Sequence, residues 1–147
     1  MNSSLVYLVQ TDTTVGFSSF DDEKLSSLKQ RPSSKKILHT VDSFKTLKKN
    51  TRIPKKFRKK VRNSKKTTFI YPNGKSFRVV DKKSDFYDFI HKFRILYSTS
   101  ANKTGKNFEK EFATIGADML VEDKRGFYET QASTIIKLSK KRFEKLR

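Results

Sequence analysis

The tripeptide Pro72-Asn73-Gly74 joins two segments that are rich in β-branched and aromatic residues. Residues 67–71 (TTFIY) precede it and residues 75–80 (KSFRVV) follow it. Asn-Gly favours tight hairpin turns because both residues tolerate the positive φ angles that such turns require. The pattern predicts a β-hairpin, which is the strongest local constraint on the fold.

Other segments predict strands and helices that alternate along the chain. Short apolar or β-branched runs predict strands at 5–9, 37–40, 94–97, 119–121 and 134–138. A helix is the alternative for residues 5–9, and residues 10–19 are predicted to form a loop. Polar first turns, helical spacing and proline positions predict helices at 21–30, 43–49, 55–62, 85–93 and 107–114. This alternation predicts a single α/β domain over residues 1–147 with a mixed sheet.

Two of the predicted helices carry an apolar face. Phe57 and Val61 lie four residues apart in the helix at 55–62, and cationic side chains cover its other faces. The helix at 85–93 has aromatic and aliphatic residues at helical spacing, namely Phe86, Phe89, Ile90 and Phe93. This second stripe predicts core packing rather than a platform for stacking bases, and His91 beside it is predicted to be structural.

The net charge of +19 indicates an anionic partner. The sequence has 34 Lys and Arg against 15 Asp and Glu, and no acidic residue lies between Asp42 and Asp81. Most of the excess lies in residues 45–66 (KTLKKNTRIPKKFRKKVRNSKK). The electrostatic field of such a positive charge would attract RNA, nucleotide phosphates or an anionic membrane surface. Composition alone does not distinguish these three partners. A solvated basic surface without a partner is the alternative for this segment.

Several classes of protein are excluded or disfavoured by composition. The sequence has no cysteine, so it has neither disulfides nor a thiolate metal site, and two histidines are too few for a usual zinc cluster. No apolar run approaches the roughly 18 to 20 residues of a transmembrane helix, and the first residues do not read as a signal peptide. The expectation is a cytoplasmic protein that does not associate with membranes.

Five stretches, taken in order, resemble the motifs of one known family. They are QTDTTVGFSS (10–19), LKQRP (28–32), FRVV (77–80), STSANKTG (98–105) and STIIKL (133–138). The corresponding family patterns are PT(D/E)TVYGLG, K-x-RP, a hairpin ending in AVRVP, STSAN-x-SG and STI(V/I)DL. The chain thus resembles the YrdC-like family, the threonylcarbamoyl-AMP synthases that begin the synthesis of N6-threonylcarbamoyladenosine at position 37 of tRNA.

This resemblance implies a fold and a reaction. The fold is a twisted mixed sheet with helices around a basic concavity, here without the N-terminal helix that usually precedes the family's first strand. The activity is that of a nucleotidyltransferase, which converts L-threonine, bicarbonate and ATP to threonylcarbamoyl-AMP and pyrophosphate, with Mg²⁺ as the expected cofactor. The implied partner is the tRNA threonylcarbamoyl transferase machinery. The resemblance does not account for the charge of residues 45–66, which would dock tRNA or double-stranded RNA through phosphate contacts.

The same resemblance assigns roles to individual residues, none of which forms a covalent intermediate. The residues that would bind ATP or its phosphates are Lys29, Arg31, Asn102 and Arg147. Those that would bind threonine are Thr11, Arg78, Ser100 and Ser133, and Arg78 would pair with the threonine carboxylate. His39 and Thr68 are further candidates, and the resemblance identifies no metal ligand.

The residue types suit this chemistry. Fixed cations stabilise the charge that develops on the α-phosphate and on the leaving pyrophosphate. Neutral Ser, Thr and Asn side chains can donate to or accept from a zwitterionic amino acid without neutralising its charges. The stretch STSAN (98–102) is therefore interpreted as a neutral hydrogen-bonding shelf beside a cationic phosphate site.

Departures from the family patterns leave a second function open. Gln10 stands where the family has proline, and Gly74 stands where it usually has threonine. Lys29 and Arg31 would also suit a helix C-terminus for electrostatic reasons alone. The alternative to an enzyme is a non-catalytic RNA-binding protein of the same fold. The structural feature that separates the two is whether Lys29, Arg31, Ser100 and Asn102 converge in one pocket, which favours the enzyme, or lie scattered.

Overall fold

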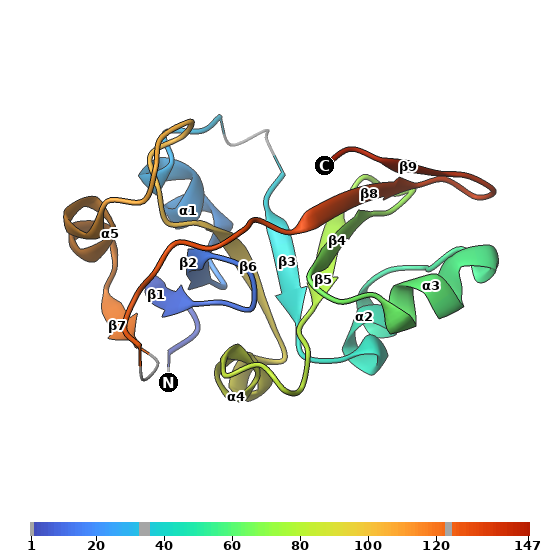
Figure 1. Ribbon diagram of the computed structural model, residues 1–147, viewed down its shortest axis with the longest axis horizontal. Coiled ribbons are helices and arrows are strands. Elements are labelled where there is room, and N and C mark those ends of the chain that lie inside the picture. Colours follow the sequence, from blue (N-terminus) through green and yellow to red (C-terminus); the bar gives the residue numbers. More distant parts are fainter. Residues whose placement is uncertain (1, 33–35, 123–124) are drawn as a thin grey trace.

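The predicted hairpin forms two adjacent strands, β4 (Thr67–Ile70) and β5 (Ser76–Val79), near the middle of a mixed sheet. In the turn, the Gly74 amide donates to the Tyr71 carbonyl at 2.8 Å, and Gly74 has a φ of +83°. The computed structural model describes residues 2–32, 36–122 and 125–147. Within them the sheet has nine strands in the order β7-β1-β2-β6-β3-β5-β4-β8-β9 (Figure 1).

The remaining strands come from segments spread along the whole chain. They are β1 (Tyr7–Gln10), β2 (Val15–Ser19), β3 (Leu38–Val41), β6 (Ile95–Ser100), β7 (Met119–Val121), β8 (Thr134–Leu138) and β9 (Phe143–Lys145). Strand pairs β1/β7, β3/β5 and β4/β8 are parallel, and the other neighbouring pairs are antiparallel. The predicted α/β fold with a mixed sheet is therefore confirmed.

Each predicted helix overlaps an observed one, although the helix predicted at 107–114 begins three residues later and ends two residues later. They are α1 (Asp22–Leu28), α2 (Phe44–Asn50), α3 (Arg58–Asn63), α4 (Phe86–Phe93) and α5 (Lys110–Gly116), with a 3-10 turn, η1 (Lys55–Phe57), before α3. The Asp21 carboxylate caps α1 by accepting from the amides of Glu23 and Lys24. In the described part of the chain, no helix is long and apolar enough to cross a membrane.

The sequence patterns did not predict two of the observed strands, β2 and β9. Residues 10–19 were predicted to form a loop, which is wrong, because Val15–Ser19 form β2 between β1 and β6. This strand is buried throughout but is built partly from Gly16, Ser18 and Ser19, so it lacks an apolar signature. A Cβ at Gly16 would lie 2.9 Å from the Thr99 carbonyl oxygen on β6, which explains why a small residue is needed there. Strand β9 is exposed at the sheet edge and was not predicted.

Helices α2 and α3 pack on a large apolar cluster of the sheet. Phe57 and Val61 are both buried, as the spacing predicts. Their cluster includes Val41, Leu47, Ile53, Phe69, Tyr71, Phe77, Ile136 and Leu138. The predicted core residues of α4 behave likewise, since Phe86, Phe89 and Ile90 pack against strand residues Tyr7, Val9 and Leu96. The aromatic stripe of α4 is therefore core, as expected.

Side chains alternate between the two faces of the central strands. On β4 and β5, Phe69 and Phe77 point into the apolar cluster, whereas Thr68 and Arg78 line a pocket on the other face. Since successive residues of a strand point to opposite faces, burying one set fixes the direction of the other. The core packing of these strands thus determines which polar side chains meet above the sheet.

Asp42 joins three elements just after β3. Its side chain is 1% exposed and accepts hydrogen bonds from Thr46 Oγ1 (2.5 Å), His91 Nδ1 (2.8 Å) and Arg94 Nη1 (3.1 Å). Thr46 lies on α2 and His91 on α4, so one carboxylate links β3 to both helices. This contact agrees with the structural role predicted for His91.

The Asp42 cluster predicts a pH-dependent contribution to stability. Although burial opposes ionisation, the hydrogen bonds from Thr46, His91 and Arg94 hold the pKa of Asp42 below its ordinary value. A lowered carboxyl pKa stabilises the fold above the unfolded pKa, and this stabilisation is lost as the pH falls through the folded pKa. We expect Asp42→Asn to lower the free energy of unfolding by about 1–3 kcal/mol at neutral pH.

Urea unfolding of the wild type and of Asp42→Asn, from neutral pH to below about pH 4, measures this difference. The gap should shrink on acidification, because the wild-type carboxyl becomes neutral as well. A gap that is the same at every pH would contradict the contribution of the ionised carboxylate.

Candidate functional site

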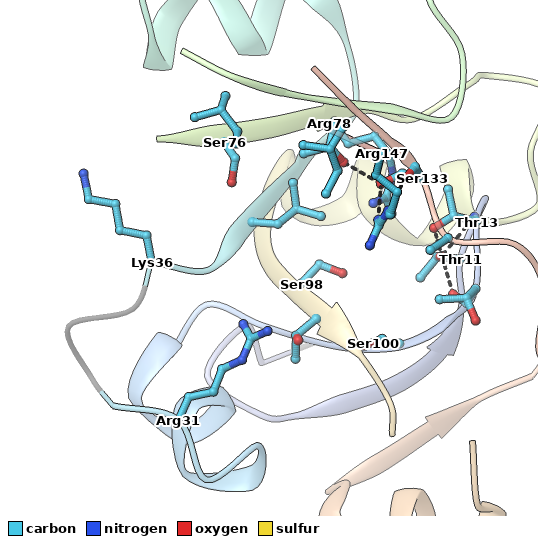
Figure 2. Close-up of a pocket in the computed structure, with 18 residues that line it drawn as sticks. Thr11, Thr13, Arg31, Lys36, Ser76, Arg78, Ser98, Ser100, Ser133 and Arg147 are labelled. Atoms are coloured by element: carbon cyan, nitrogen blue, oxygen red, sulfur yellow. Dashed lines mark hydrogen bonds between the residues drawn. The ribbon is translucent and has the colours of Figure 1, made fainter. Parts of the chain in front are cut away.

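A pocket of about 400 Å³ lies on the polar face of the sheet (Figure 2). Its walls come from strands β2, β3, β4, β5, β6 and β8, from the turn before β2 and from the segment after α1. The predicted site residues that line it are Thr11, Arg31, Thr68, Arg78, Ser100, Ser133 and Arg147. Residues from six separate parts of the chain thus converge, whereas Lys29, Asn102 and His39 do not line this pocket.

Cations enter the pocket from two sides. Arg31 lies on the side of α1, and Arg78 and Arg147 lie over the strands of the hairpin (Figure 2). Lys36 also lines the pocket, but its Nζ reaches the β4–β5 turn, where it donates to the Asn73 carbonyl oxygen at 3.4 Å. The Arg31 Nε atom is buried and has no hydrogen-bond partner among the described residues. A buried guanidinium nitrogen without a partner is costly, so this donor suits an anionic ligand.

Lys29 is buried beside the pocket rather than in its lining. Its Nζ donates to the Ser100 carbonyl oxygen at 3.1 Å, to the Asn102 carbonyl oxygen, and to Asn102 Oδ1 at 3.1 Å. Burial, and then the nearby charge of Arg31, lower the pKa of Lys29 to about 8. The direct role of Lys29 in this structure is therefore to fix the backbone of STSAN behind the pocket.

Asn102, like Lys29, lies beside the pocket and not in its lining. Its Nδ2 donates to the carbonyl oxygens of Lys103 (3.1 Å) and Lys106 (2.6 Å), which closes the loop after β6. Strand β6 extends through Ser100, so the first three residues of STSAN lie in the strand and not in a turn. This places Ser98 and Ser100, two residues apart, in the same pocket lining.

Hydroxyl groups line the side of the pocket opposite Arg31. Thr11 Oγ1 donates to the Thr14 carbonyl oxygen at 2.5 Å and accepts from the Thr13 amide at 3.1 Å. The hydroxyls of Thr68 and Ser133 lie 2.8 Å apart, which joins β4 to the start of β8. These bonds hold the hydroxyls in place as a neutral, polar surface.

Arg147 closes one end of the pocket by contacts with Ser133. Its Nε donates to the Ser133 carbonyl oxygen at 2.9 Å, and its Nη2 donates to Ser133 Oγ at 3.4 Å (Figure 2). The Arg147 backbone reaches this position because it bonds to Ile135 of β8. The structure thus brings together Arg147 and Ser133, which were assigned to different substrates.

An ion pair between Arg78 and Asp12 forms the deepest charged contact near the pocket. Arg78 Nη2 lies 3.1 Å from Asp12 Oδ1, and the two side chains are 4% and 2% exposed. Asp12 fixes the guanidinium and offsets its charge, because a buried charge is stable only when it is paired. No local pattern assigns this role to Asp12, since the pair spans 66 positions.

His39 lies away from this pocket. Its ring stacks between Phe77 (centroids 4.7 Å apart) and Tyr97 (4.3 Å), while Leu38, the preceding residue, lines the pocket. Burial is the main cause that lowers the pKa of His39, so its ring is neutral at physiological pH. The structure therefore gives His39 a packing role and does not bring it to the other candidates.

Several lining residues were not singled out by the sequence. They are Thr13, Thr14, Gly16, Lys36, Leu38, Ile70, Ser76, Ser98, Thr99, Ala132 and Ile135. A strand period of two would have identified Ser76 from Arg78 and Ser98 from Ser100. Lys36 offers no such signal, because only the path of the chain after α1 brings it to the pocket.

No metal cluster accompanies this site. The described residues contain no group of three or more His, Asp or Glu side chains that could hold a metal ion, and no carboxylate lines the pocket. The donor set is therefore one of hydroxyls, guanidinium groups and ammonium groups, which suits anions and polar neutral groups.

Comparison with solved structures identifies the fold. Sua5 of P. abyssi complexed with L-threonine matches with a TM-score of 0.79 and 18% identity, over 98% of this chain and 50% of that one. E. coli YciO matches with a TM-score of 0.75 and 16% identity, over 98% and 82% of the two chains. Full-length HypF in its phosphate- and nucleotide-bound form matches with a TM-score of 0.74 and 13% identity, over 98% and 27%.

These matches confirm the predicted YrdC-like fold across the whole described chain. This chain spans about half the length of the Sua5 structures. No model of a protein family matches the sequence, and no curated protein matches it either. At such low identity the matches establish the arrangement of the strands and helices.

The positions of Lys29 and Arg31 predict unequal effects of their removal on the free energy of unfolding. Lys29→Met leaves the backbone carbonyls of Ser100 and Asn102 without their part-buried donor, so we expect a loss of about 1–3 kcal/mol in the free energy of unfolding. Arg31→Ala removes a side chain that makes no such contact, and we expect a change of at most about 1 kcal/mol. Chemical denaturation of both variants measures this contrast, and equal losses would contradict it.

The lowered pKa of Lys29 makes a second prediction. The unfolded chain binds a proton at Lys29 up to its ordinary pKa of 10.5, whereas the folded chain releases it near pH 8. The unfolded state therefore holds more protons in this window, so wild-type stability should rise with pH relative to Lys29→Met. Denaturation at pH values on both sides of about 8 tests this, and parallel curves for the two proteins would contradict the buried ammonium.

Proposed function

We propose that the chain is a threonylcarbamoyl-AMP synthase, a nucleotidyltransferase that uses ATP, L-threonine and bicarbonate. The observation that carries the proposal is the convergence of Arg31, Ser100, Ser133 and Arg147 with Thr11 and Arg78 in one pocket. These residues belong to motifs that are far apart in the sequence, so their meeting supports the motif resemblance and not a chance match.

Two of the solved structures with this fold support the ligand classes. Sua5 was solved in complex with L-threonine, and HypF was solved with phosphate and nucleotide bound. Each ligand is thus bound by a protein that contains this fold, which makes up 50% of that Sua5 chain and 27% of the HypF chain. For the present chain, the pocket offers cations for a polyphosphate and hydroxyls for an amino acid side by side.

The cationic end of the pocket would bind the phosphates. Arg31 is the cation on the α1 side, and its unpaired Nε can donate to a phosphate oxygen. Lys29 would act behind it through the backbone of Ser100 and Asn102, which Lys29 fixes. Fixed donors at the α-phosphate lower the barrier because they need not reorganise as charge develops.

The hydroxyl end would bind the amino acid. Thr11, Thr68 and Ser133 are buried and hydrogen-bonded to one another or to backbone, so their positions are fixed. Arg78 would receive the threonine carboxylate while it keeps its contact with Asp12. The hydroxyls would accept from the threonine amine and orient it toward the phosphates.

The chemistry needs no protein nucleophile. The threonine amine adds to CO₂ derived from bicarbonate and loses a proton, which gives a carbamate; one water is released from the bicarbonate. A carbamate oxygen then attacks the α-phosphorus of ATP, the bond to the β-phosphate oxygen breaks, and pyrophosphate leaves. The protein contributes by positioning the two substrates and stabilising the phosphate charges.

Mg²⁺ enters this proposal only with the nucleotide. The pocket offers no carboxylate ligand, so its own residues do not fit a resident Mg²⁺ ion. Mg²⁺ commonly binds through substrate phosphates with few protein ligands, and ATP reaches such pockets as its magnesium complex. The residues named above would then bind the phosphate oxygens that the metal leaves free.

A second candidate function is that of a non-catalytic RNA-binding protein of the same fold. It is favoured by the lysines and arginines of residues 45–66, most of which are exposed on α2, η1 and α3. In the enzyme proposal, the same segment would contact tRNA or double-stranded RNA, and the product would pass to the tRNA threonylcarbamoyl transferase machinery. A cytoplasmic location belongs to this proposal, since it is where these partners would meet.

We expect the purified protein to release pyrophosphate from ATP only when L-threonine, bicarbonate and Mg²⁺ are all present. Arg31→Ala should lower the rate by about 100-fold or more, because a fixed donor to the reacting phosphates is lost. The assay follows pyrophosphate with a coupled enzyme and threonylcarbamoyl-AMP by mass spectrometry.

Lys92→Ala, on the exposed face of α4, is the matched control that also removes one positive charge. Its rate should equal that of the wild type. Folded protein that binds neither ATP nor L-threonine in calorimetry would refute the enzyme and favour the RNA-binding alternative.

A further inference from the structure

A second pocket, of about 450 Å³, adjoins the candidate site at Thr11 and Thr13, which line both pockets. Its lining comes from the end of β1, from the loop before α4, from Lys66 before β4 and from residues 125–130. The last of these belong to the segment that runs across the sheet toward β8 (Figure 1). Hereafter this cavity is called the second pocket.

Gln10 presents an unmet hydrogen-bond donor at the second pocket. Its Oε1 accepts from the Tyr128 amide at 3.0 Å, although the two residues are 118 positions apart. Because a backbone amide only donates, this contact fixes the orientation of the Gln10 side-chain amide. Its Nε2 is buried and has no hydrogen-bond partner among the described residues, and Gln10 as a whole is 6% exposed.

Asp12 presents an unmet acceptor at the same pocket. Its Oδ1 accepts from Arg78 Nε at 3.2 Å and lies 3.1 Å from Arg78 Nη2. Its Oδ2 is buried without a partner in the part of the chain that the structure describes, and the side chain is 2% exposed. A buried donor or acceptor that stays unpaired destabilises a fold. Two such atoms in one pocket therefore indicate a partner from outside the chain.

The charges of the second pocket balance, unlike those of the candidate site. Equal numbers of acidic and basic side chains line it, namely Asp12, Asp81, Asp85, Lys66, Lys83 and Arg125. At its inner end, Arg78 already offsets the charge of Asp12. A ligand that brought a full charge to this end would lose its hydration without gaining a counterion. The two unmet atoms thus suit a neutral group.

Three other ligand classes fit this pocket less well. The described residues contain no group of His, Asp and Glu side chains that could hold a metal ion. A simple anion would approach the carboxylates of Asp12, Asp81 and Asp85. A purely apolar ligand would leave Gln10 Nε2 and Asp12 Oδ2 unpaired. The remaining class is a neutral molecule with a donor and an acceptor side by side.

We propose that the second pocket binds a small molecule that carries a primary carboxamide. The carboxamide oxygen accepts from Gln10 Nε2, and its N–H donates to Asp12 Oδ2. A primary carboxamide presents both groups on one edge and has no charge. Side chains two residues apart in extended chain project to the same side, so both atoms can reach this edge. Phe86 and Tyr128 also line the pocket, which suits a carboxamide carried on a ring.

The donor in this site is a feature of this chain. Gln10 stands where the motif of the YrdC-like family has proline, whose side chain has neither a donor nor an acceptor. The proposed synthesis of threonylcarbamoyl-AMP gives no role to Gln10, and Asp12 acts there only through Arg78. The second site therefore goes beyond the proposed function and does not depend on it.

Two-dimensional NMR of the ¹⁵N-labelled wild type with nicotinamide, without ATP or threonine, tests the site. The amides of Gln10, Ser84 and Tyr128, which line only the second pocket, should shift with a Kd of about 1 mM, as expected for so small a ligand. The amides of Arg31 and Ser98, which line only the candidate site, should not shift. Nicotinic acid, which has a carboxylate on the same ring, should bind at least about tenfold more weakly.

Two substitutions of Gln10 separate recognition from folding. Gln10→Met removes the donor and should weaken nicotinamide binding by about tenfold or more. Gln10→Glu keeps an oxygen for the Tyr128 amide but replaces the donor by an acceptor. This variant should lose nicotinamide and gain binding of benzamidine, whose amidinium group donates from both nitrogens. Such an exchange of ligands does not follow from a structural defect, and it keeps the test valid if Gln10→Met fails to fold.

Gln131→Met and Gln131→Glu are the matched controls. Gln131 is an exposed glutamine in the segment before β8, and it lines neither pocket. Both control variants should bind nicotinamide as the wild type does and should not gain benzamidine binding. Equal weakening by Gln131→Met would overturn the assignment of Gln10.

The remaining outcomes decide the ligand. Absence of shifts at about 50 mM nicotinamide, far above the Kd expected for a ligand of this size, would overturn the site and assign the two atoms to bound water. Equal binding of nicotinic acid would overturn the carboxamide as the recognised group. Tighter binding of L-glutamine than of nicotinamide would support the carboxamide and make an amino acid its carrier. Pyrophosphate release reports only on the candidate site, so its presence or absence leaves these outcomes unchanged.

Discussion

The alternation of side chains on the central strands is the constraint on which both faces of the molecule depend. Phe69 and Phe77 are buried under α2 and α3, and this burial fixes the opposite direction for Thr68 and Arg78. A shift of one residue in the pairing of β4 with β5 would exchange these sets, placing Arg78 in the apolar cluster. The free energy of apolar burial thus selects the register that assembles the pocket.

The cationic side chains of this molecule are of two kinds. Some are bound by partners within the fold, and others lack such partners and can bind a ligand. Lys29 and Arg78 are buried, and the fold satisfies them with carbonyl oxygens and with Asp12. Arg31 at the pocket takes part in no ion pair among the described residues, and neither do the exposed cations beside the β8–β9 turn, namely Arg52, Lys55, Lys56, Lys140 and Lys141. The first kind of cation shapes the site, because an unpaired buried charge is too costly to keep, and the second kind can be neutralised by a ligand.

Sequence patterns predicted the elements that carry their own local signal. The Asn73-Gly74 turn and the apolar face of α4 are examples, because turn chemistry and helical spacing are local properties. Strand β2 carries no such signal, since Gly16 and Ser18 are there for close contact with β6. The resemblance assigned roles to Arg78 and Lys29 but identified neither Asp12 as the partner of Arg78 nor the backbone of STSAN as the partner of Lys29. Both contacts depend on tertiary structure.

The β8–β9 hairpin shows how one element can serve two sites. Near its ends, Arg147 is bonded to Ser133 and Ile135 at the pocket, and near its turn, Lys56 and Phe57 hold Lys141 and Phe143 beside the basic segment, residues 45–66. Strand β8 is also paired with β4, so the hairpin is fixed along its length. If a ligand at one end changes the free energy of binding at the other end, the second ligand changes the binding of the first by the same amount, because coupling between sites is reciprocal. Measuring both affinities on one protein would therefore determine whether the hairpin acts as a rigid support or as a link.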